Sequence, residues 1–171
     1  MRDVIRRAFV LLFVAFPLLL AAACRPQSTP ATGGTPVAAP EAYVPGLGEM
    51  MSLQQMRHAK LWFAGQAENW ELAAYEIDEL GEGFDDIVKF HPTHKDSPVA
   101  PKDAIPRMVT EPLKDLRAAT DKKDSRTFER AYNSLTSACN NCHQATNFAF
   151  NAVQTPAMNP YPNQVFARIS K

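Results

Sequence analysis

The chain has 171 residues, enough for one domain with appendages and a single hydrophobic core. Its 18 basic and 18 acidic side chains balance, so the overall charge does not favour nucleic acid as a partner. Any functional signal must therefore lie in local motifs rather than in the overall composition.

Residues 1–23 have the features of a bacterial export signal. Arg2, Arg6 and Arg7 form a basic head, and the apolar residues 8–23 follow it. This apolar run is shorter than the roughly 20 residues that a membrane-spanning helix needs. We therefore predict that residues 1–23 are a signal peptide, removed after export to the periplasm or cell envelope.

Cys24 directly follows this segment. The sequence LAAAC at residues 20–24 resembles the bacterial lipobox, whose cysteine is acylated and becomes the new N-terminus, although Ala21 stands where a larger aliphatic residue is usual. Ordinary cleavage would instead leave an unpaired thiol in an oxidising compartment. We expect lipidation of Cys24, with the Pro-rich residues 24–45 as a linker that tethers the protein to the membrane.

Residues 46–150 contain four stretches with the three- and four-residue spacing of apolar side chains that is typical of amphipathic helices. Pro112 is expected to kink or split the third stretch, and Asp124 or Ser125 suits the start of the fourth. We predict an all-α, antiparallel four-helix bundle, followed by an irregular C-terminal tail over residues 151–171. The predicted helices cover about 47–66, 70–90, 103–120 and 124–146.

The sequence CNNCH, which begins at Cys139, is compatible with three kinds of site. A redox dithiol would need its first cysteine at a helix N-terminus that follows a strand, and no strand is predicted. A zinc site would need four ligands, and only His91 and His94 could join the two cysteines, which leaves His143 unused. Covalent haem attachment uses every residue of the motif and agrees with export.

The placement of CNNCH near the end of the last of four helices resembles the class II cytochromes c, the cytochrome c-prime group. The resemblance covers about residues 47–144, and the stretches MRHAKLWFAG and NPYPNQVF look like a subgroup of small exported haem proteins related to that group. It implies one haem c per chain, with thioether bonds from Cys139 and Cys142 and with His143 as the proximal iron ligand.

The first helix should cover the opposite face of the haem. Its inner stripe contains Met50, Met51, Gln54 and His58 as candidates to cover the haem, and Met50, Met51 and His58 are the expected choices for the sixth iron ligand. The resemblance implies a methionine near the helix start in six-coordinate members, and His58 lies two turns further along. A five-coordinate iron, shielded by an apolar residue such as Leu61, also stays open.

Two functions follow from these expectations. A haem in a small bundle without an evident acid–base pair predicts a c-type cytochrome that transfers one electron to redox partner proteins in the bacterial envelope, rather than an enzyme. The alternative is a five-coordinate protein that binds or senses nitric oxide or carbon monoxide. A peroxidase-type activity is a weaker third hypothesis, and a homodimer through the first helix stays open.

Overall fold

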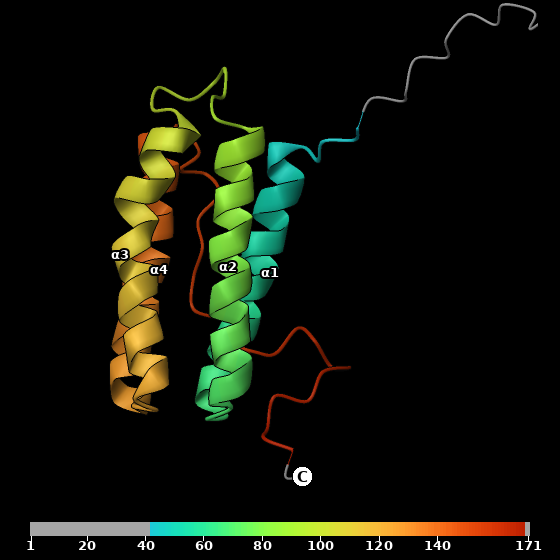
Figure 1. The fold of residues 1–171 in the computed structure, drawn as a ribbon, viewed down its shortest axis with the longest axis vertical. Coiled ribbons are helices and arrows are strands. Elements are labelled where there is room, and N and C mark those ends of the chain that lie inside the picture. Colours follow the sequence, from blue (N-terminus) through green and yellow to red (C-terminus); the bar gives the residue numbers. More distant parts are fainter. Residues whose placement is uncertain (1–41, 170–171) are drawn as a thin grey trace, which may run out of the picture. The chain divides into compact units, whose positions relative to one another are not determined.

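The computed structural model describes residues 42–169 and confirms the predicted all-α, antiparallel four-helix bundle. Successive helices run in opposite directions (Figure 1). The predicted signal peptide, Cys24 and the linker up to residue 41 lie outside the described residues. The helices are α1 (Leu47–Gln66), α2 (Trp70–Phe90), α3 (Pro101–Asp121) and α4 (Ser125–Ala145).

The second and fourth helices begin at side-chain caps. The Asn69 side chain accepts a hydrogen bond from the Leu72 backbone N–H at 3.2 Å. Asp124 accepts one from the Thr127 N–H at 3.1 Å, so of the two expected caps, Asp124 and Ser125, it is Asp124 that caps α4. Each cap satisfies a backbone donor that has no partner within the helix, and this fixes where the helix starts.

Three helices end in the same way, with a residue in the left-handed region just beyond the last turn. Glu68 after α1, Lys123 after α3 and Asn147 after α4 have φ angles of 52°, 55° and 69°. The following backbone N–H then bonds back to a carbonyl five residues earlier, as from Phe148 to His143 at 2.7 Å. This closes the helix end and turns the chain sharply.

The third helix differs from the prediction in two respects. It begins at Pro101, two residues earlier than expected, because proline at the first helical positions loses no intrahelical hydrogen bond. It also continues through Pro112, so α3 is not split at this residue. Proline there leaves the Met108 carbonyl without its helical partner, but both residues line a shallow surface hollow that water can enter.

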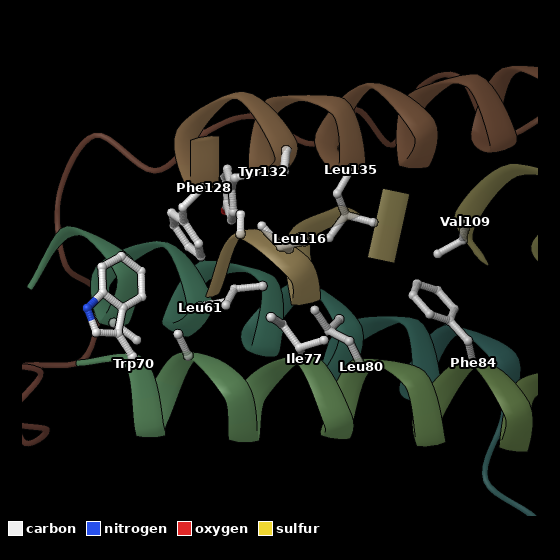
Figure 2. Close-up of a cluster of buried hydrophobic side chains, with 14 of the residues drawn as sticks. Leu61, Trp70, Ile77, Leu80, Phe84, Val109, Leu116, Phe128, Tyr132 and Leu135 are labelled. Carbon is white, nitrogen blue, oxygen red and sulfur yellow. The ribbon is translucent and has the colours of Figure 1, made fainter. Parts of the chain in front are cut away.

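A single core fills the space between the helices. Figure 2 shows labelled side chains from all four helices meeting in this interior. Tyr132 and Phe128 are the largest of the fully buried side chains. The labelled set comprises Leu61, Trp70, Ile77, Leu80, Phe84, Val109, Leu116, Phe128, Tyr132 and Leu135.

The C-terminal tail is irregular, as predicted, and runs back along the bundle from the end of α4 (Figure 1). Thr155 bonds to Asn133 of α4 at 3.1 Å, and the Phe166 ring packs on Phe63 of α1 with centroids 5.6 Å apart. Asn69 also donates to the Phe166 carbonyl at 3.1 Å. The tail thus bridges α1 and α4, the adjacent pair of helices with the least direct contact.

Within residues 42–169, none of the helices is both long enough and apolar enough to cross a membrane.

Candidate functional site

A hollow lies inside the bundle, near the end of α4 that carries CNNCH. It consists of a narrow cavity of about 50 Å³ and a wider pocket of about 290 Å³. The two share lining residues and therefore adjoin each other. The shared residues are Met51, Gln55, Ile105, Cys142, His143 and Asn151.

The helix α4 brings the three predicted haem-attachment residues to this hollow. Cys139, Cys142 and His143 occupy positions i, i+3 and i+4, which lie on one face of an α-helix. All three line the narrow cavity, opposite apolar side chains from α2 and α3 such as Leu80 and Val109. The motif therefore faces the interior of the bundle.

Both cysteine thiols in the motif are free and partly or wholly buried. Burial raises the pKa of Cys139 to about 12, with a smaller contribution from the nearby Cys142 thiol. Burial also raises the pKa of Cys142. A redox dithiol needs the opposite shift, toward a stable thiolate. The geometry therefore does not support the dithiol interpretation.

His143 is held in one tautomer by the C-terminal tail. Its Nδ1 lies 2.6 Å from the Asn151 backbone carbonyl oxygen. Since a carbonyl can only accept, Nδ1 must carry the proton, and Nε2 of the neutral ring keeps a lone pair. No hydrogen-bond partner for Nε2 is found in residues 42–169. This is the state that an imidazole needs to bind a metal ion.

The candidate iron ligands on α1 differ in whether they line the hollow or lie in the hydrophobic core. Met51 is half-buried and lines both parts of the hollow together with Cys142 and His143. Met50 packs in the hydrophobic core and lines neither part, and Leu61 is completely buried in that core. Of these three residues, only Met51 lines the hollow together with His143.

His58 also lines the narrow cavity, but both of its ring nitrogens have partners. Nε2 lies 2.8 Å from the Thr136 hydroxyl, and Nδ1 lies 2.9 Å from the Tyr132 hydroxyl. The Tyr132 hydroxyl also donates to the His58 carbonyl at 2.9 Å. Burial lowers the pKa of His58 to about 4, so the ring is neutral near pH 7. Iron ligation by His58 would break this network.

The loop histidines do not complete a zinc site. His91 bonds through Nε2 to the Pro45 carbonyl at 2.7 Å. The His94 ring packs on Phe148 with centroids 5.4 Å apart. The described part of the chain contains no group of three or more His, Cys, Asp or Glu residues arranged to hold a metal ion. The zinc interpretation of the two cysteines therefore gains no support from the geometry.

The sequence did not identify the polar residues that support the two histidines. Thr136 and Tyr132 are four residues apart on α4, so they face the same way, and this spacing was a signal for a buried polar pair. Asn151 acts through its backbone carbonyl, which any residue has. No sequence pattern could have indicated its role.

Comparison with known proteins adds no match. The chain matches no family model, no curated protein and no solved structure. The functional interpretation consequently depends on the motif, its resemblance and the geometry of the hollow.

Proposed function

We propose that the protein is a c-type cytochrome that carries one electron in the bacterial cell envelope, with one covalently bound haem c. The observation that carries this proposal is the convergence of Cys139, Cys142 and His143 on one mainly apolar hollow. The Asn151 carbonyl accepts a hydrogen bond from His143 Nδ1, which leaves Nε2 as the ring atom that could bind iron.

The chemistry of the donor set fits haem c. The two thiols, one turn apart, suit the two vinyl groups on one edge of a porphyrin, and Nε2 of His143 suits the iron. Apolar walls from α2, α3 and α4 suit the porphyrin ring and exclude water from it. When bound, the haem iron would supply the change between ferrous and ferric states.

We assign the sixth ligand to Met51. Of Met50, Met51 and His58, Met51 alone lines the hollow, is only partly buried against the core and has its donor atom outside the hydrogen-bond network around His58. A thioether and an imidazole together favour electron transfer, because both ligands stay in place when the iron changes oxidation state. Acylated Cys24 would hold this carrier near redox partner proteins at the membrane.

The attachment claim is tested with protein matured in the periplasm. Pyridine haemochrome analysis should give a c-type spectrum for the wild type, whereas Cys139→Ser combined with Cys142→Ser should retain no covalent haem. Cys24→Ser is the matched control, because it should keep the haem and move the protein from the membrane to the soluble fraction. Haem that stays attached to the double variant would contradict the proposal.

The distal ligand is tested with Met51→Leu and Met50→Leu. Both changes remove a sulfur while nearly conserving volume. Met51→Leu should open the iron to carbon monoxide and change the ferrous spectrum, and Met50→Leu should leave both unchanged. If neither variant binds carbon monoxide and neither shows a changed ferrous spectrum, Met51 is not the ligand. If the wild type already binds carbon monoxide, the gas-binding alternative is favoured.

A further inference from the structure

Asn140, the first residue between the two cysteines, forms a two-bond clamp with the C-terminal tail. Its Nδ2 donates to the Val153 carbonyl at 2.8 Å, and its Oδ1 accepts from the Val153 N–H at 2.8 Å. A side-chain amide has the same donor and acceptor as a peptide group, so it pairs with Val153 as a neighbouring strand would. This pairing satisfies both backbone groups of Val153.

The clamp lies next to the carbonyl that orients His143. Asn151, whose oxygen accepts from His143 Nδ1, is only two residues before Val153. On its other side, the Asn151 N–H donates to the Phe148 carbonyl at 2.9 Å, and the Phe148 N–H donates to the His143 carbonyl. The Asn151 carbonyl is therefore fixed from both directions, by the turn after α4 and by Asn140.

Asn141 provides a comparison within the same motif. It has the same side chain and lies between the same two cysteines, yet it is exposed and lines a shallow surface hollow formed by residues of α3 and α4. None of the side-chain hydrogen bonds found in residues 42–169 involves Asn141, whereas Asn140 makes two. The two asparagines of CNNCH therefore have different roles.

We propose that Asn140 is a positioning residue that lowers the midpoint potential of the haem iron. Asn140 holds Val153, which keeps the nearby Asn151 carbonyl in place on the imidazole of His143. This inference rests on the proposed haem function. A histidine that donates firmly to a carbonyl is a more basic ligand, which favours ferric over ferrous iron. Loss of the clamp lets the tail move and weakens that hydrogen bond.

The test compares Asn140→Ala with Asn141→Ala in matured protein. Asn140→Ala should raise the midpoint potential in a potentiometric titration and accelerate hydrogen exchange at the Val153 amide. Asn141→Ala should change neither.

Two results would overturn the inference. Faster exchange at Val153 with an unchanged potential would show that Asn140 only anchors the tail. Unchanged exchange in Asn140→Ala would show that the clamp does not hold Val153. Failure of the proposed function would be recognised separately, as a wild-type protein without covalent haem, because the exchange measurement does not require haem.

Discussion

The two ends of the bundle use the same four helices and fill the space between them differently. At the closed end, near the turn between α1 and α2, Gly65 lets α1 approach the Phe128 ring, and Trp70 packs on that ring with centroids 5.9 Å apart. At the open end, Met51 and Cys139 face a hollow. The closed end supplies packing, whereas the open end keeps space for a ligand.

His58 lies between these two regions and belongs to both. Its ring packs on Tyr132, with centroids 4.5 Å apart, and at the same time lines the narrow cavity. The hollow is therefore bounded on this side by a hydrogen-bonded polar layer of His58, Thr136 and Tyr132 as well as by apolar packing. Such a layer is stable only while each of its groups has a partner.

The largest expected effect comes from opening the closed end. Phe128→Ala removes a completely buried ring and should lower the free energy of unfolding by about 3–5 kcal/mol, measured by urea denaturation. Phe128→Leu, which keeps more of the apolar volume, is the matched control and should cost less. A loss below about 1 kcal/mol for Phe128→Ala would show that the closed end is not tightly packed.

The next effect concerns the layer between the ends. Because burial lowers the pKa of His58 from 6.5 to about 4, the unfolded chain binds a proton between these values that the folded chain does not. The free energy of unfolding is therefore unaffected by the titration of His58 above pH 6.5. It decreases as the pH falls from 6.5 toward 4, by on the order of 3 kcal/mol in total.

This pH dependence can be measured by urea unfolding between pH 4.5 and pH 7.5, and His58→Gln should flatten it. Gln cannot titrate but can still bond to Tyr132 or Thr136, so it is a close control. Equal slopes for wild type and His58→Gln would contradict a buried, neutral His58.

The smallest effect contrasts two helical glycines. A Cβ at Gly65 would overlap the Phe128 ring, whereas a Cβ at Gly83 would meet the ends of the flexible Gln54 and Arg57 side chains. Gly65→Ala should therefore cost about 1–3 kcal/mol through overpacking, partly offset by the better helix propensity of alanine. Gly83→Ala should be close to neutral, since those side chains can move. If urea denaturation gave the same loss in the free energy of unfolding for Gly65→Ala and Gly83→Ala, the tighter packing proposed around Gly65 would be contradicted.

The sequence predicted the helices well because each has local signals. Apolar spacing set the extents of α1 and α2, and Asp124 marked the start of α4. The predicted split at Pro112 does not occur, although the helix taken alone gave reason to expect one. A missing hydrogen bond is tolerated where water reaches the free carbonyl and where the rest of α3 is held against its neighbours.

The candidate site was predictable only on α4. Spacing alone placed Cys139, Cys142 and His143 together, but it put Met50, Met51 and His58 on one stripe without separating them. Their separation depends on packing and on Tyr132, which is 74 residues from His58 in the chain. The tail contacts depend on backbone groups of an irregular segment, which carry no sequence pattern.

The most direct test of the central claim is the ferrous absorption spectrum of matured wild-type protein, recorded before and after addition of carbon monoxide. The proposed electron carrier should show a low-spin c-type spectrum that carbon monoxide does not change, because Met51 and His143 would both bind the iron and leave no open site for the gas. A spectrum without haem bands would contradict haem attachment, and a high-spin spectrum shifted by carbon monoxide would contradict electron transfer through a six-coordinate iron.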